Sequence, residues 1–189
     1  MKLLVFIGPS GSGKSTIARA LHARGVIEVT PTWTTRPRRD DEESGTIEHQ
    51  FVDEDEFAHL EQNGFFHDVV NMFGLPYRYG LPRVESPGEG KIPAVIVRAP
   101  LVQSLSLHYP DRVVYQIETV RDRARDRIES RSPADLDGGT RFNGWKRELA
   151  LGRHVTSRVF ETGESVRATV AAIQRAIIED FLEERSGLG

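Results

Sequence analysis

Short apolar runs alternate with amphipathic stretches along the chain, and this pattern predicts strands alternating with helices. Runs at Leu3–Ile7, residues 94–97 and residues 113–117 are apolar and bounded by polar residues or glycine, so we expect buried strands there. A last short strand is expected at Val159 and Phe160. Strands that alternate with helices favour a parallel sheet of the α/β class.

Helical patterns fill much of the sequence between these runs. We expect helices over residues 15–24, 53–63, 119–131 and 165–184, with one more beginning near residue 141. The helix at 53–63 has the clearest boundaries, because Asp53 and Glu56 form a capping box and Gly64 follows its last turn. Thr119 is expected to cap the helix at 119–131. By contrast, residues 28–51 show no clean period. We expect residues 28–83 as a whole to be an irregular subdomain inserted beside the sheet, with a loop or hairpin at residues 74–82.

Length and composition fit one globular domain. The chain has 189 residues, of which 38% are apolar and 28% charged. It has no cysteine, which excludes disulfides and thiolate metal sites. No apolar stretch reaches the roughly 18–20 residues that span a bilayer, and the N-terminus lacks a signal-peptide pattern. We therefore expect a soluble, cytoplasmic protein.

The net charge of −3 hides a segregation of charge. No Lys or Arg lies between Asp40 and Tyr77, whereas arginines crowd residues 36–39 and 121–158. Biased genome composition is one explanation for so many arginines. The other is that guanidinium groups are retained because they bind phosphates in a bidentate way.

A glycine-rich loop supports the second explanation. The string GPSGSGKST satisfies G-x-x-x-x-G-K-[ST] and stands between an expected strand and an expected helix. Its backbone N–H groups and the helix N-terminus can cradle phosphates, Lys14 can reach the β- and γ-phosphates, and the Ser15 hydroxyl can bind Mg²⁺. The nucleotide-binding residues expected here are Gly8, Ser10, Gly11, Ser12, Gly13, Lys14, Ser15 and Thr16.

The rest of the chain narrows the class of nucleotide-binding protein. No N-K-x-D string is present, as a GTPase would need to read its base, and a large AAA-type ATPase would need more chain. A small phosphotransferase fits, and it requires a second phosphate site for the acceptor.

Candidates for that second phosphate site lie within residues 32–80, which resemble a known acceptor-binding subdomain. The T-T-R-x-x-R stretch at 34–39, the F-V-x-x-x-E-F string at 51–57 and the tyrosine–glycine turn at 79–80 resemble the acceptor-binding subdomain of guanylate kinases. With the glycine-rich loop, the resemblance covers almost the whole chain. It implies one P-loop NTPase domain with a parallel sheet flanked by helices. Its core is residues 1–27 and 84–189, with a mobile lid at about 131–145 and an acceptor-binding subdomain at about 28–83.

The resemblance also implies acceptor contacts. Arg36 and Arg39 hold the α-phosphate with Tyr79, and two arginines three apart in a loop can present both forks to one phosphate. His49 stands where the family has a second tyrosine, Thr32 where it has a serine, and Asp68 where a glutamate reads guanine.

Three positions depart from guanylate kinases. Leu81 replaces a hydroxyl, Ile96 an acid linked to Mg²⁺, and Arg98 an acid near the base. A guanidinium cannot accept a hydrogen bond from a base amino group. Ribose 1,5-bisphosphate phosphokinases share the fold, resemble the chain around EHQFVDEDEF and have a histidine at the position of His49. An acceptor with two phosphates would also suit Arg98.

Three arginines are implied as the lid set. Arg127 and Arg131 lie four apart and so share a helix face, and Arg141 follows the Gly-Gly-containing connection. Cations on a mobile segment suit phosphoryl transfer, which depends on positioning and charge stabilisation. The alternative is a solvated helix with ion pairs to Asp122 and Asp126. No general base is needed, because the attacking phosphate oxygen is already anionic.

Lys14, Arg127, Arg131 and Arg141 are therefore the expected catalytic residues of a kinase that converts ATP and GMP to ADP and GDP with Mg²⁺ at Ser15. Alternatives are a kinase of another phosphorylated acceptor, such as ribose 1,5-bisphosphate, and a non-catalytic binding module. Modules of that kind usually have degraded phosphate loops, whereas Lys14 and Ser15 are intact. Interspersed acids argue against nucleic-acid binding. No membrane partner is expected, and the oligomeric state and pathway stay open.

Overall fold

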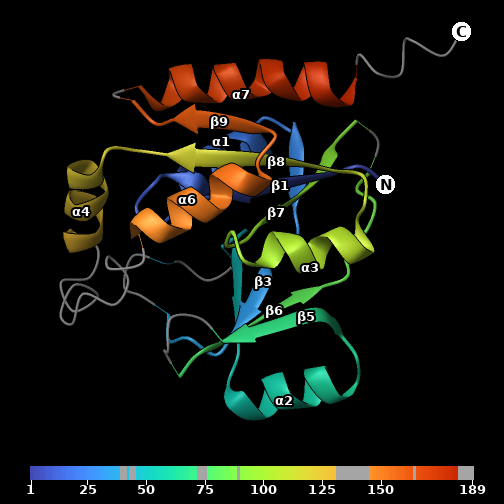
Figure 1. The fold of residues 1–189 in the computed structure, drawn as a ribbon. Coiled ribbons are helices and arrows are strands. Elements are labelled where there is room, and N and C mark those ends of the chain that lie inside the picture. Colours follow the sequence, from blue (N-terminus) through green and yellow to red (C-terminus); the bar gives the residue numbers. More distant parts are fainter. Residues whose placement is uncertain are drawn as a thin grey trace, which may run out of the picture.

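A computed structural model describes residues 1–38, 42, 46–71, 76–88, 90–130, 145–163 and 165–182. Within these ranges the chain forms a five-stranded sheet and a four-stranded sheet (Figure 1). All pairs of the five-stranded sheet are parallel, as the alternation of strands and helices predicts. Its strands, in spatial order, are β2 (Ile27–Val29), β7 (Ile92–Ile96), β1 (Leu3–Ile7), β8 (Arg112–Glu118) and β9 (Arg158–Glu161).

Helices cover both faces of the five-stranded sheet. Leu4 and Phe6 of β1 join an apolar cluster with α1 (Lys14–Ala23) and α7 (Val166–Phe181). The alternate residues of β1 join a second cluster with α3 (Leu101–His108). On that second face α6 (Trp145–Val155) also packs, since Gly152 lies against Ile7. Burial on both faces explains why β1 is an uninterrupted apolar run.

The four-stranded sheet is inserted between β2 and β7 along the chain and lies below the first sheet in Figure 1. Its strands, in spatial order, are β4 (His49–Phe51), β3 (Thr32–Thr34), β6 (Arg78–Pro82) and β5 (Phe66–Asn71). The helix α2 (Glu54–Gln62) packs on this sheet through stacking of Phe57 on Phe66. The sequence predicted an irregular segment here. That prediction is wrong, because strands of three residues, such as β3 and β4, are too short to show a period of two.

Side-chain caps mark the start of α2 and α7. The Asp53 side chain accepts a hydrogen bond of 2.8 Å from the backbone N–H of Glu56, which confirms the predicted cap of α2. The Ser165 side chain caps α7, which the sequence analysis did not predict. Thr119 does not cap α4 (Arg121–Glu129), because its hydroxyl donates to the carbonyl of Thr162 instead. The helix α3 was not predicted.

The predicted lid at about 131–145 lies outside the described residues except for Trp145, the first residue of α6. Arg39, Arg131 and Arg141 also lie outside them. None of the helices that the structure describes is long and apolar enough to cross a membrane.

Candidate active site

The glycine-rich loop, residues 8–13, connects β1 to α1 at the carboxyl edge of the five-stranded sheet. Gly8 and Gly11 have φ angles of 141° and 77°. A Cβ atom at Gly8 would lie 2.2 Å from the carbonyl oxygen of Ile117, and one at Gly11 would lie 2.6 Å from that of Ala124. Both backbone conformation and close packing therefore require glycine at these positions. We call residues 8–15 the phosphate loop.

Lys14 folds back over this loop. Its ammonium donates hydrogen bonds to the carbonyl oxygens of Gly8 at 2.6 Å and Pro9 at 2.9 Å. Burial and then the nearby positive charge of Arg98 lower the pKa of Lys14 to about 7, against an opposing effect of Glu148. A cation held in this way lacks a strong anionic partner, which is the arrangement expected of a side chain that binds a phosphate ligand.

Two further side chains hold the phosphate loop from α4 and from the end of β9. The Arg127 guanidinium donates to the carbonyl of Gly11 at 3.0 Å. The Thr162 hydroxyl donates to the carbonyl of Ser12 at 2.9 Å. The buried Ser12 hydroxyl has no hydrogen-bond partner among the described residues. Arg127 therefore lies at the phosphate loop.

Arg98 also reaches the phosphate loop. Its NH1 group donates to both carboxylate oxygens of Glu148, at 2.9 and 2.6 Å, and its NH2 group donates to the Ser10 hydroxyl at 3.2 Å. Glu148 lies on α6 and is buried. The sequence analysis missed Glu148, since nothing in the local pattern around a helical glutamate identifies a partner fifty residues away.

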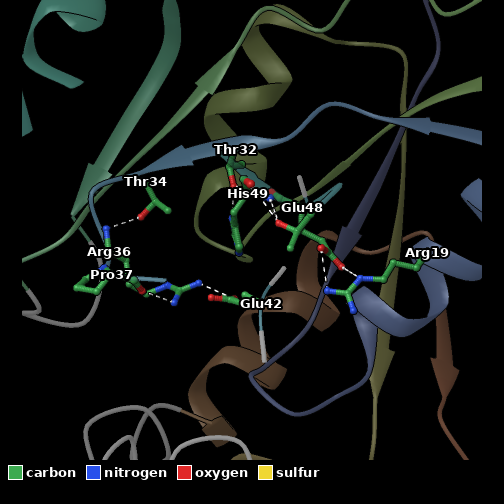
Figure 2. Close-up of polar contacts among 9 residues, drawn as sticks. Arg19, Thr32, Thr34, Arg36, Pro37, Glu42, Glu48 and His49 are labelled. Carbon is green, nitrogen blue, oxygen red and sulfur yellow. Dashed lines mark hydrogen bonds and ion pairs between the residues drawn. The ribbon is translucent and has the colours of Figure 1, made fainter. Parts of the chain in front are cut away.

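A second set of polar side chains gathers on the four-stranded sheet (Figure 2). Arg36 is buried, with only 5% of its surface exposed, and it donates to Glu42 at 2.7 Å and to the Pro37 carbonyl at 2.8 Å. Its guanidinium also lies over the Phe51 ring, 5.1 Å from the ring centre. Burial acts to lower the pKa of Arg36, but Glu42, and then Tyr79, outweigh it and raise that pKa. Arg36 and Tyr79 are thus neighbours, as predicted.

Thr32 and His49 belong to the same set. The Thr32 hydroxyl lies 2.8 Å from Nδ1 of His49 and donates to the carbonyl of Glu48 at 3.2 Å. The ring of His49 meets that of Tyr79 edge to face at 6.3 Å. These contacts fix the His49 ring and bring Thr32, His49, Tyr79 and Arg36 together.

The remaining predicted positions lie apart from these contacts. Asp68 is on β5, opposite Leu81 of β6, and is half-buried. The Leu81 side chain is buried in the apolar cluster on the α3 face, and Ile96 is buried in the cluster on the α1 face. Ser15 is the second residue of α1 and is half-buried, whereas Thr16 is exposed.

Relatives of this chain share one name. A protein named guanylate kinase from Chlorobium luteolum is 30% identical over 138 residues, which cover 71% of this chain and 70% of the relative. One from Symbiobacterium thermophilum is 33% identical over 134 residues, which cover 68% of this chain and 62% of the relative. One from Frankia casuarinae is 40% identical over 84 residues, which cover 44% of each chain. The chain thus spans less than two thirds of the length of several relatives that it matches. No family model matches the chain.

Solved structures show the same fold. The crystal structure of guanylate kinase from Anaplasma phagocytophilum superposes with a TM-score of 0.70 at 21% identity, covering 95% of this chain and 86% of that one. Shikimate kinase from Acinetobacter baumannii superposes with a TM-score of 0.50 at 13% identity, covering 95% and 94%. The fold is therefore that of a P-loop kinase, and the match to the Chlorobium luteolum protein over most of both chains decides the family. This chain belongs to the guanylate kinase family.

Proposed function

We propose that the protein transfers the terminal phosphoryl group of ATP to GMP, giving ADP and GDP. One observation carries the proposal: the chain places cations in two separate sets, Lys14, Arg98 and Arg127 at the phosphate loop and Arg36 on the four-stranded sheet. Phosphoryl transfer between two phosphorylated substrates requires two such sets. Membership of the guanylate kinase family supports both the reaction and the substrates.

On the donor side, the phosphate loop holds the triphosphate. The N–H groups of the loop and the N-terminus of α1 point toward the phosphates. Lys14 exchanges the carbonyl oxygens of Gly8 and Pro9 for β- and γ-phosphate oxygens, which restores its full charge. Arg127 adds charge from α4, and Arg131 and Arg141 are proposed to complete the set.

Magnesium fits the residues of the loop. The Ser15 hydroxyl, at the start of α1, is an oxygen ligand of the kind that Mg²⁺ accepts alongside phosphate oxygens and water. Among the described residues no three His, Cys, Asp or Glu side chains form a metal cluster. Phosphate oxygens of ATP and water molecules would be the other ligands of Mg²⁺. Bound Mg²⁺ would neutralise charge on the transferred group.

On the acceptor side, Arg36 and Arg39 bind the GMP phosphate, with Tyr79 and His49 as further hydrogen-bond donors. The ion pair of Arg36 with Glu42 keeps the buried guanidinium in place and compensates its charge. Thr32 and Asp68 are proposed to contact guanine. The acceptor-binding subdomain is proposed at about residues 28–83, beside a core of residues 1–27 and 84–189, although Glu28 and Val29 belong to β2 of the core sheet.

The chemistry needs no side-chain base. A GMP phosphate oxygen attacks the γ-phosphorus, the bond to the β-γ bridging oxygen breaks, and ADP leaves. The protein aligns the two phosphates and stabilises the charge on the equatorial oxygens. A correctly placed arginine contributes about 10³–10⁵ in rate in P-loop enzymes. A cytoplasmic location belongs to the same proposal.

An ADP-release assay with ATP and Mg²⁺ tests the proposal. The acceptor panel consists of GMP, dGMP, AMP, UMP and ribose 1,5-bisphosphate, and GMP is expected to give the highest kcat/KM. Turnover with the bisphosphate alone would show that the charge inversion at Arg98 has changed the acceptor. ATP binding without turnover on any acceptor would instead identify a binding module.

A further inference from the structure

We propose that Arg98 is an additional cation for the terminal phosphate of the nucleotide, and that Glu148 is a positioning residue that holds its guanidinium at the phosphate loop. The proposal rests on the proposed function only in taking ATP as the donor. It gives a role to Arg98, which is basic where guanylate kinases have an acid. It also gives a role to Glu148, which has none in the reaction described above.

The position of Arg98 in the sheet supports this role. β7 lies between β2 and β1, and residues Ile92–Ile96 run parallel to both neighbours. The carboxyl end of β7 therefore lies beside the carboxyl end of β1, where the phosphate loop begins. Ligands of open α/β sheets bind at these strand ends. Arg98 follows β7 by two residues and stands at that edge.

The contacts of Arg98 point at the loop rather than into the protein core. One end of the guanidinium is held by the Glu148 carboxylate, and the other reaches the hydroxyl of Ser10, inside the phosphate loop. The side chains of Arg98 and Glu148 are only 18% and 6% exposed. A buried carboxylate that holds a guanidinium in this way orients it with little remaining freedom.

The charges around Arg98 and Glu148 favour the binding of a phosphate. Arg98 stands close enough to Lys14 to contribute to the lowering of the Lys14 pKa, so two cations share one small region of the loop. Like charges held together destabilise each other, and an anion with several negative oxygens relieves the repulsion. Glu148 compensates one charge in the absence of nucleotide, and the terminal phosphate supplies further compensation when ATP binds.

Packing of α6 fixes Glu148. A Cβ atom at Gly152 would lie 2.1 Å from Oε1 of Gln116, so the absence of a side chain at Gly152 lets α6 approach β8. The amide of Gln116 also donates to the carbonyl of Leu149 at 3.1 Å. Leu149 and Gly152, on either side of the helical turn that follows Glu148, thus both contact the Gln116 side chain of β8.

The test compares ATP with ADP, since only ATP carries the terminal phosphate. Binding of each nucleotide is measured for the wild type and for Arg98→Gln, Glu148→Gln and the double variant, in which no buried charge is left unpaired. Asp180→Asn is the matched control: Asp180 accepts hydrogen bonds from Arg158 at 2.9 and 2.6 Å, as Glu148 does from Arg98, but lies on α7 away from the phosphate loop.

We expect Arg98→Gln to weaken ATP binding by about 10- to 100-fold, the usual effect of one charge-assisted hydrogen-bonding group, with ADP binding changed by less than about threefold. Glu148→Gln should shift the ATP-to-ADP affinity ratio in the same direction by a smaller factor. Because Glu148 acts through Arg98, the double variant should match Arg98→Gln. Asp180→Asn should leave the ratio unchanged.

Three results would overturn the proposal: equal losses for ATP and ADP in Arg98→Gln, an unchanged ATP affinity in that variant, or additive effects of the two substitutions. Equal losses would identify a purely structural ion pair. The comparison uses no acceptor, so it remains decisive even if GMP proves not to be the substrate.

Discussion

The guanidinium of Arg19 holds the carboxylate of Glu48 at both oxygens, with Nε 2.8 Å from Oε1 and NH2 3.1 Å from Oε2 (Figure 2). Arg19 lies on α1, the helix that follows the phosphate loop, and Glu48 lies directly before β4 of the other sheet. The carbonyl of Glu48 accepts hydrogen bonds from both the N–H and the hydroxyl of Thr32. This pair therefore connects the proposed donor and acceptor sites.

Replacing Glu48 with Gln should impair acceptor binding more than nucleotide binding. The Glu48 side chain is only 3% exposed, and loss of its ion pair frees the segment that positions Thr32 and His49. We expect the KM for GMP to rise about three- to tenfold, as for the loss of about 1 kcal/mol of positioning energy, while the KM for ATP stays within twofold (roughly 0.4 kcal/mol). Steady-state kinetics with each substrate varied in turn provides the measurement.

A matched control for this variant is Glu129→Gln. Glu129 pairs with Arg125 on the exposed surface of α4, and exposed pairs contribute little. Equal increases in both KM values for Glu48→Gln would contradict a specific link to the acceptor site.

ATP binding should be accompanied by proton uptake at pH 8. Lys14 has a pKa of about 7 without nucleotide, so most of it is neutral at pH 8, and the negative phosphates are expected to raise its pKa well above 8 and protonate it fully. Roughly 0.9 proton per site should be taken up. Calorimetry in two buffers of different ionisation enthalpy measures this number.

Lys14→Arg supplies the control for that experiment, because arginine stays charged at every pH used and cannot take up a proton. The variant should bind ATP without the buffer-dependent heat. The same buffer dependence in Lys14→Arg would assign the proton to another group.

The lowered pKa of Lys14 also makes folding stability depend on pH. The unfolded chain keeps the proton on Lys14 up to its ordinary value of 10.5, whereas the folded chain loses it near pH 7. The unfolded state binds more protons between these values, so this group makes the folded state more stable as pH rises from about 7 to about 10.5. Below pH 7 its destabilising contribution is constant.

Lys14→Met isolates this effect. The free energy of unfolding of the variant should exceed that of the wild type by at least about 1 kcal/mol at pH 6, and the difference should shrink toward pH 10. Urea unfolding at several pH values measures it. A constant difference across this range would rule out Lys14 as the source.

Asp68→Ala should reduce the use of GMP selectively. If the carboxylate reads guanine, kcat/KM for GMP falls by about tenfold or more, since a buried donor pair on the base is left unpaired, while ATP binding is unchanged. Asp55→Ala, a change on the exposed surface of α2, serves as the control. An unchanged ranking of acceptors in the Asp68 variant would remove Asp68 from base recognition.

Local sequence patterns predicted the parts of the fold that depend on neighbours along the chain. The strand at Leu3–Ile7 is an apolar run buried on both faces, and the cap at Asp53 uses a contact only three residues away. The glycine-rich loop was identified because its glycines have to follow a strict spacing. The short strands of the second sheet were missed, since their pairing rather than their pattern defines them.

The residues of the candidate site likewise fall into those that a local motif predicts and those that only the fold brings together. Lys14 and Arg36 could be found from motifs, whereas the partners Glu148 and Glu48 could not, because they lie 50 and 29 residues from the arginines that they hold. Arg98 was recognised as a charge of unexpected sign. Only the fold shows that an acid from α6 accompanies it.

The insertion of one sheet into the other has a consequence for how kinases of this fold diversify. The inserted segment leaves from β2 and returns into β7, and these two strands pair directly, with Val29 opposite Ala94. The segment between β2 and β7, which we propose binds the acceptor, is one block of chain, and exchanging it leaves the strand order around the phosphate loop intact. Recombination at these two junctions offers a route to kinases with the same donor and a different acceptor.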